Sequence, residues 1–293
     1  MGATYVVTLR EGFEAALLLG IVYTYLDKVA GRVHYRWATL GALAGAAASV
    51  LAGIAVSFLS GALLDLGPDL IATSVMLIAV VVLTWHGWWM RQHARGISTD
   101  VKRRIDEAKL TQRLWIIGVV AFTGVFREGA ETVLFLWGLM NQTTISEWAG
   151  LTGGVLGLAT AAVLGWLIFR GGKHISLPRF FATTSVLLLL VAAGLFSSVI
   201  GKLESFGWLP ASPTLWDTSS LLSDQGTAGG FLAGLIGYRA QPSLFEVLAY
   251  AGYLLVAGYL FFRDAKRSGP DADGARPSAR STSPRSEGVL TPS

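Results

Sequence analysis

Seven apolar stretches of 18 or more residues, separated by polar connections, divide most of the chain. A stretch of this length crosses a hydrocarbon core of about 30 Å as an α-helix, which rises about 1.5 Å per residue. The first stretch begins almost at Met1, without a charged segment before it, so we expect a retained helix rather than a cleaved signal. The pattern predicts an all-α membrane protein with helices over residues 3–26, 36–60, 68–90, 114–139, 148–169, 180–201 and 243–262.

The composition agrees with a membrane protein and excludes several kinds of site. Only 14% of the residues are charged, against about a quarter in soluble domains. The chain has no cysteine, which excludes disulfides, iron–sulfur clusters and thiol catalysis. After Phe262 the composition changes to Ser, Pro, Gly, Arg and Asp. We therefore expect a transmembrane domain over residues 1–263 and a disordered tail over residues 264–293.

The basic residues predict how the helices are oriented. Nineteen of the 23 lie in the connections after the first, third and fifth stretches and in the tail. The opposite connections hold only Lys202 and Arg239. The positive-inside rule then places the N-terminus outside and the C-terminus in the cytoplasm, as a multi-pass protein of the cytoplasmic membrane. Topology accounts for the net charge of +4, so no nucleic acid is needed as a partner.

An internal repeat joins the two halves of the chain. Arg10-Glu11-Gly12-Phe13-Glu14 is echoed by Arg127-Glu128-Gly129-Ala130-Glu131, and small residues recur every fourth position in both 36–60 and 148–169. Each copy holds three helices, about residues 2–92 and 114–204, so the second copy must be inverted relative to the first. Inverted repeats are typical of secondary transporters, with the substrate near the midplane. The 203–242 outer loop and the 243–262 helix lie outside the repeat.

The two motifs carry the candidate chemistry because both lie deep inside apolar stretches. An ionised group at that depth costs roughly 2.5–3.5 kcal/mol on insertion scales. Within each motif Arg and the second Glu are four residues apart and can pair along a helix. If the two helices face each other, four carboxylates and two guanidinium groups converge with two negative charges in excess. Carboxylate oxygens suit iron, manganese, magnesium or calcium, and the alternative is a pair of Arg–Glu bridges that only hold the helices together.

A duplicated REGxE motif in a seven-helix protein resembles the iron permease family of the fungal high-affinity permeases and the bacterial EfeU type. The resemblance covers residues 1–262, and the family usually carries Leu where this chain has Phe13 and Ala130. It implies uptake of iron as a transported substrate, with no tightly bound cofactor and, in some members, a separate extracytoplasmic oxidase or iron-binding partner. By the resemblance the iron ligands are Glu11, Glu14, Glu128 and Glu131, organised by Arg10 and Arg127.

Other residues are weaker candidates for the path of the ion. His86 lies toward the cytoplasmic end of its helix, where it could receive the metal, although such a histidine is more often a packing residue. Asp217 and Asp224 are isolated acids of the outer loop. Glu246 opens the last helix, where a carboxylate favours the helix dipole. The apolar stretch Ala228–Tyr238 has only 11 residues and is too short to span, so we expect it to be re-entrant or interfacial.

Three functions remain open from the sequence. The first is an iron permease, and the same site could carry another cation such as manganese or lead. The second is an intramembrane enzyme that uses the paired carboxylates, against which stands the absence of a nucleophile or metalloprotease motif. The third is a membrane scaffold, which the buried carboxylates argue against. We predict a permease and not an enzyme.

Overall fold

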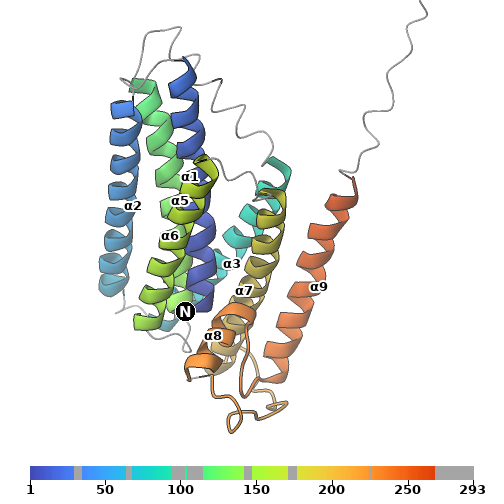
Figure 1. The fold of residues 1–293 in the computed structure, drawn as a ribbon. Helices are drawn as coiled ribbons and strands as arrows, with labels where there is room; N and C mark the ends of the chain where they lie inside the picture. The colour runs from blue at the N-terminus through green and yellow to red at the C-terminus, as the bar shows by residue number, and fades with distance from the viewer. Residues whose placement is uncertain are drawn as a thin grey trace, which may run out of the picture.

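The computed structural model describes residues 1–29, 35–63, 68–93, 103, 115–141, 147–170, 177–224 and 226–267 (Figure 1). Their secondary structure is helical, apart from an isolated bridge between Thr214 and Ser243. Seven helices have 23 to 29 residues, and a short one, α8, has 10. The helices are α1 (Gly2–Val29), α2 (Tyr35–Leu63), α3 (Pro68–His93), α5 (Trp115–Met140), α6 (Glu147–Phe169), α7 (Leu177–Ser205), α8 (Thr227–Ile236) and α9 (Leu244–Arg267).

Each predicted apolar stretch coincides with one long helix, and the helices run a few residues further at most ends. Among the described residues, four helices are long and apolar enough to cross a membrane: α2, α3, α6 and α7. Helices α1 and α5 are as long, but each carries the three charged residues of one motif. Helix α9 has an apolar segment over Leu244–Leu260. Continuous helices are the expected form of such segments because lipid offers no hydrogen-bond partners to a free backbone.

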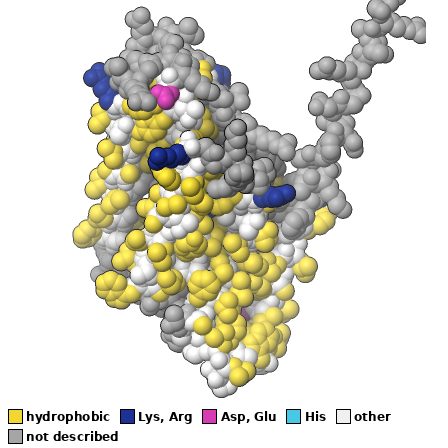
Figure 2. Space-filling model, in the orientation of Figure 1, with side chains coloured by type: hydrophobic (Ala, Val, Ile, Leu, Met, Phe, Trp, Pro, Cys, Tyr) yellow, Lys and Arg dark blue, Asp and Glu magenta, His cyan; other side chains and the backbone are white. Residues whose placement is uncertain are grey.

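The outer surface of the bundle is apolar. Phe58 of α2, Trp148 of α6 and Leu255 of α9 expose about three quarters of their accessible surface. Figure 2 shows hydrophobic side chains over most of the visible face, with the visible Lys and Arg side chains in the half that holds the C-terminal end of α9. Contiguous apolar surface of this extent is unfavourable in water. The chain is therefore a membrane protein with several spanning helices.

The helices pack so that the two halves of the chain interleave. Helix α2 packs along α5, α6 packs along α1, and α1 contacts α5. On the other side of the bundle α3 packs on α7, and α9 packs on α7 (Figure 1). The main hydrophobic core lies between α1, α3, α5 and α7, where Val7, Met76, Phe135 and Leu195 are fully buried. Helices α1 and α5 are thereby held at the centre of the molecule.

The stripes of small residues form the two closest helix contacts. Gly41 and Gly45 of α2 lie directly against the backbone of α5, and Gly153 and Gly157 of α6 lie against the backbone of α1. A Cβ added at Gly45 would approach the carbonyl oxygen of Phe122 to 2.7 Å. Small residues allow such approach, and van der Waals packing drives helix association in membranes. The stripes therefore pack within one chain.

The 203–242 loop contains a short helix, and Glu246 at the start of α9 makes contacts that the sequence did not predict. The predicted short apolar stretch overlaps α8, which lies against the start of α1 through Phe231 and Gly2. The helix ends at Ile236 and is capped by Gly237, which has a positive φ of 72°. Glu246 does more than favour a helix dipole, because its carboxylate lies 2.8 Å from Arg239 and accepts a hydrogen bond from the Ser243 amide.

Helix α9 continues past residue 263, where the disordered tail was predicted to begin. Residues 264–267, assigned to the tail, continue the helix to Arg267. Basic residues near a helix C-terminus interact favourably with its dipole, which extends α9 past its apolar segment. The predicted disordered tail over residues 268–293 lies outside the described part of the chain.

Candidate metal site

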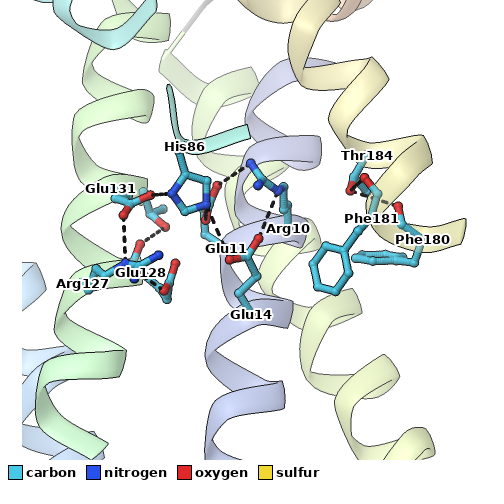
Figure 3. Close-up of polar contacts among 11 residues, drawn as sticks. Arg10, Glu11, Glu14, His86, Arg127, Glu128, Glu131, Phe180, Phe181 and Thr184 are labelled. Atoms are coloured by element: carbon cyan, nitrogen blue, oxygen red, sulfur yellow. Dashed lines mark hydrogen bonds and ion pairs between the residues drawn. The ribbon is translucent and has the colours of Figure 1, made fainter. Parts of the chain in front are cut away.

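The two motifs face each other at the contact between α1 and α5 (Figure 3). Within α1, Arg10 Nε lies 3.1 Å from Glu14 Oε1, and Arg10 Nη1 lies 3.6 Å from Glu11 Oε1. These three side chains are almost completely buried. The i, i+4 spacing on a helix brings Arg10 and Glu14 together, as the sequence predicted.

The second motif repeats these pairs in α5. Arg127 Nε lies 3.2 Å from Glu131 Oε1 and 3.4 Å from Glu128 Oε1. The Arg127 guanidinium is also 5.0 Å from the ring centroid of Trp89, which belongs to α3. Each motif thus contributes a guanidinium paired with the carboxylates of its own helix. If all four carboxylates are ionised, the two motifs together carry two negative charges in excess.

Helix α3 adds His86 to the centre of this cluster. Its Nδ1 lies 2.5 Å from Glu131 Oε2, while its Nε2 lies 3.5 Å from Glu14 Oε2 and 3.8 Å from Glu11 Oε2. The contact with Glu131 is a close ion-pair contact rather than an aligned hydrogen bond. The sequence placed His86 on the cytoplasmic side of the motifs as a minor candidate. Only the packing of α3 beside α5 brings it between them.

Four of these side chains form a group with the geometry of a cation site. Glu11, Glu14, His86 and Glu128 are all buried, and each offers one ligand atom within 4.8 Å of the others. Glu128 Oε2 and His86 Nε2 have no hydrogen-bond partner among the described residues. Burying polar atoms without partners is costly, and a cation would satisfy several of them at once. Glu131 stands outside this group.

The glycines of the motifs serve helix packing. A Cβ added at Gly12 would lie 3.1 Å from the Ala161 side chain of α6, and one at Gly129 would clash with Ser49 of α2. The sequence predicted that Gly12 lets a facing helix come close, and α6 is that helix. The motifs therefore place charged residues on one side of their helices and a packing seam on the other.

A cavity of about 580 Å³ reaches two of the carboxylates from between α1, α2, α5 and α6. Glu11 and Glu128 line one part of it, and Met140 at the end of α5 and Gly150 near the start of α6 line another. Most of its remaining lining is apolar. In the predicted topology the ends of α5 and α6 near Met140 and Gly150 are outer ends.

Asp217 and Asp224, the predicted acidic candidates of the 203–242 loop, do not join the buried group. Asp217 accepts hydrogen bonds from Ser219 through Oδ1 and from Gln241 through Oδ2. These hydrogen bonds, with Ser219 first, hold the pKa of Asp217 below its ordinary value. Both of its oxygens are therefore already engaged. Asp224 lies in the same loop, close enough to act on the buried Glu246 electrostatically.

Comparison with known proteins identifies the family. The model of the iron permease FTR1 family matches residues 1–264. The chain belongs to this family. Its members are permeases, so the chain is a transporter and not an enzyme.

Bacterial relatives match along almost their whole length. The ferrous iron permease EfeU of Escherichia coli O6:K15:H31 (strain 536 / UPEC) is 35% identical over 262 residues, which cover 88% of this chain and 94% of the relative. The ferrous iron permease EfeU of Yersinia pestis is 31% identical over 265 residues, with 89% and 93% covered. No solved structure matches the chain significantly. The resemblance to an iron permease predicted from the sequence is confirmed.

Proposed function

We propose that this chain moves ferrous iron into the cell across the cytoplasmic membrane, through a site lined by Glu11, Glu14, Glu128 and Glu131. Membership of an iron permease family supports iron as the transported ion. The relatives are named as ferrous iron permeases, which favours Fe²⁺. The observation that carries the site is the group of buried carboxylates and an imidazole at the contact between the two central helices. A divalent cation would balance the two excess negative charges of the motifs.

The two arginines organise the site. Each lies at ion-pair distance from both carboxylates of its own motif, which keeps those carboxylates ionised in an apolar environment. His86 belongs to the path, and it acts within the cluster rather than after it. Asp217 and Asp224 contribute at most a negative potential at the outer face, because the loop holds them away from the cluster.

Two inverted repeats account for the way the helices pair. Adding 117 to a residue number converts Arg10 to Arg127, and the same shift relates the carbonyls that the glycines meet. The glycines themselves correspond at a shift of 112, since 153 − 41 and 157 − 45 both give 112. Gly153 meets the carbonyl of Met1, as Gly41 meets that of Gly118. Gly157 meets the carbonyl of Tyr5, as Gly45 meets that of Phe122.

A pseudo-twofold relation of this kind is typical of transporters that bind their substrate at the repeat interface. The repeats are about 2–92 and 114–204, and rocking of one against the other gives alternating access by analogy with such transporters.

The long helices α1, α2, α3, α5, α6, α7 and α9 are the seven spans of this proposal. The N-terminus is outside and the C-terminus cytoplasmic, while α8 and the rest of the 203–242 loop stay on the outer side. The ion then enters from the ends of α5 and α6, where the cavity leads toward Glu11 and Glu128. Its largely apolar walls require water to enter with the ion. A separate extracytoplasmic oxidase or iron-binding protein is a further prediction of the family resemblance.

Uptake of radioactive Fe²⁺ into vesicles containing the purified full chain tests the function directly. Glu128→Gln removes one charged ligand while keeping the side-chain size, and we expect uptake per inserted protein to fall by about 100-fold. Asp27→Asn is the matched control because Asp27 is an exposed carboxylate on α1, and it should transport at the wild-type rate. Wild-type uptake by Glu128→Gln would contradict the proposed site. Uptake of Mn²⁺ or Pb²⁺ but not Fe²⁺ would show another cargo.

A further inference from the structure

We propose that iron is held by three carboxylates and one imidazole, with Nε2 of His86 as a ligand and Glu131 as a positioning residue behind His86. The proposal rests on the proposed function, because it assumes that the cluster binds the transported ion. It replaces a symmetric set of four glutamates by an asymmetric set of Glu11, Glu14, Glu128 and His86. The two motifs therefore have different roles.

The two ring nitrogens of His86 face different groups (Figure 3). Nδ1 lies 2.5 Å from Glu131 Oε2, on the side away from α1. Nε2 points toward Glu14 and Glu11, at 3.5 and 3.8 Å, and has no hydrogen-bond partner in the described part of the chain. Metal-binding histidines commonly give one N–H to a carboxylate and the other nitrogen's lone pair to the metal. His86 has the corresponding placement, with Nδ1 beside the Glu131 carboxylate and Nε2 toward Glu14 and Glu11.

Glu131 is occupied on both oxygens. Oε1 lies 3.2 Å from Arg127 Nε, and Oε2 faces the imidazole. Glu128 differs in its second oxygen. Neither Oε2 accepts a hydrogen bond among the described residues, but Glu131 Oε2 has the imidazole at 2.5 Å, whereas no ion pair is formed by the buried Glu128 Oε2 in the described part of the chain. The result is a chain of contacts from Arg127 through Glu131 to His86. Such a chain fixes the ring orientation and leaves Glu128 as the ligand that α5 supplies.

The second half of the protein brings no matching imidazole to the described site. Helix α7 presents Phe180, Phe181 and Thr184 on the side of Arg10 (Figure 3). Phe13 of the first motif packs against Phe180 with ring centroids 4.3 Å apart. The nitrogen ligand thus comes from α3 alone.

A single imidazole would set which divalent cations the site accepts. Mg²⁺ and Ca²⁺ are bound mainly through oxygen, whereas Fe²⁺ and Mn²⁺ also accept imidazole nitrogen. Replacing one of four oxygen ligands by nitrogen therefore disfavours Mg²⁺ and Ca²⁺ relative to iron. We assign His86 as a specificity-determining residue.

Pulsed electron paramagnetic resonance on the detergent-purified full chain tests the ligand set, with Mn²⁺ as the probe. An imidazole bound to Mn²⁺ gives a ¹⁴N modulation that carboxylates do not give. We expect the modulation in the wild type and in Glu131→Gln, whose amide oxygen can still accept a hydrogen bond from Nδ1. We expect the ¹⁴N modulation to disappear in His86→Gln under conditions where Mn²⁺ remains bound. In a competition experiment, the ratio of Mn²⁺ affinity to Mg²⁺ affinity should be smaller in His86→Gln than in the wild type.

Affinities separate the positioning role from a ligand role. Glu131→Gln should weaken Mn²⁺ binding by about tenfold and Glu131→Leu by about 100-fold, the range found for groups that support a metal ligand. Loss of the ¹⁴N modulation in Glu131→Leu, while Mn²⁺ is still bound, would support positioning through His86.

Wild-type Mn²⁺ binding without ¹⁴N modulation would overturn this inference and leave the carboxylate site standing. The inference also fails if Glu131→Gln loses as much affinity as Glu128→Gln. If Glu128→Gln binds Mn²⁺ as tightly as the wild type, the proposed function itself fails.

Discussion

The two copies of the charged motif have the same spacing and different surroundings. In the first copy the Arg10 side chain is 0% exposed, whereas in the second the Arg127 side chain is 44% exposed. The residue between the glycine and the second glutamate is Phe13 in one copy, where it is fully buried, and Ala130 in the other, where it is half-buried. Identical sequence spacing therefore produces the same ion pairs within each helix, but it does not determine how deeply the side chains of the motif are buried.

The two motifs differ in burial because the third long helix of each half, α3 or α7, packs differently beside them. Helix α7 places the aromatic rings of Phe180 and Phe181 on the side of Arg10, where both pack against Phe13 (Figure 3). Helix α3 instead places Trp89 over Arg127 and inserts His86 beside Glu131. One motif is thus sealed by apolar packing, and the other is joined to a further polar residue. The two halves differ in this way because α3 and α7 carry different side chains beside the motifs.

The largest expected difference between the motifs concerns their arginines. Arg10→Gln removes the positive charge beside two buried carboxylates, so we expect it to lower the free energy of unfolding by about 4 kcal/mol. Arg127→Gln removes a guanidinium that is partly exposed, and about 1 kcal/mol is expected. Chemical denaturation of the detergent-solubilised proteins measures both values. Equal losses would show that burial does not distinguish the two motifs.

The glycine seams should behave alike in both halves, in contrast to the arginines. Gly45→Leu and Gly157→Leu each force a side chain against a neighbouring backbone, which we expect to cost about 3 kcal/mol. Gly252→Leu on α9 is the control, because a Cβ there meets nothing within 4 Å. The same denaturation measurement applies. Unequal losses at Gly45 and Gly157 would argue against equivalent packing in two repeats.

Aromatic packing should stabilise only the first motif. Phe13→Ala leaves a space against Phe180 and Phe181, and we expect a loss of about 2 kcal/mol from lost van der Waals contacts. Ala130→Leu introduces the residue usual in the family at a half-buried position, with an expected change within about 0.5 kcal/mol. Thermal unfolding followed by intrinsic fluorescence compares them. A loss at Ala130→Leu as large as at Phe13→Ala would contradict the asymmetry.

The smallest effect is expected in the outer loop, away from both motifs. The pKa of Asp217 is lowered below its ordinary value of 3.8 by hydrogen bonds from Ser219 and Gln241. A lowered pKa in the folded state contributes stability above pH 3.8, and this stability is lost as the pH falls through the lowered value. The protection factor of the Ser219 amide against hydrogen exchange, corrected for the intrinsic pH dependence of exchange, should therefore fall at acidic pH, and Asp217→Asn should lower it already at pH 7.

Mn²⁺ binding at pH 7 provides the control for that loop variant. It should be unchanged in Asp217→Asn, because Asp217 does not belong to the buried group. Weaker binding in this variant would place the loop in the ion path.

The sequence by itself determined the helices and the chemistry. Long apolar stretches must become helices in lipid, since every backbone polar group needs a partner within the segment. Charged residues that are so costly in lipid had to face each other, and the duplicated spacing of Arg10 and Glu14 indicated where. The stripes of small residues indicated close helix contacts. The resemblance to the family was carried by the same motif, which this chain repeats in two apolar stretches.

Only the tertiary structure decided which side chains share the site. The helical period places Glu11 and Glu14 on one face of α1, but no local pattern tells which face of α3 meets α5. His86 enters the buried group and Glu131 lies outside it, on the Nδ1 side of His86, because helix crossing and tilt set distances between residues far apart in the chain. Those quantities depend on the packing of all the helices together, and the spacing along one helix does not contain them.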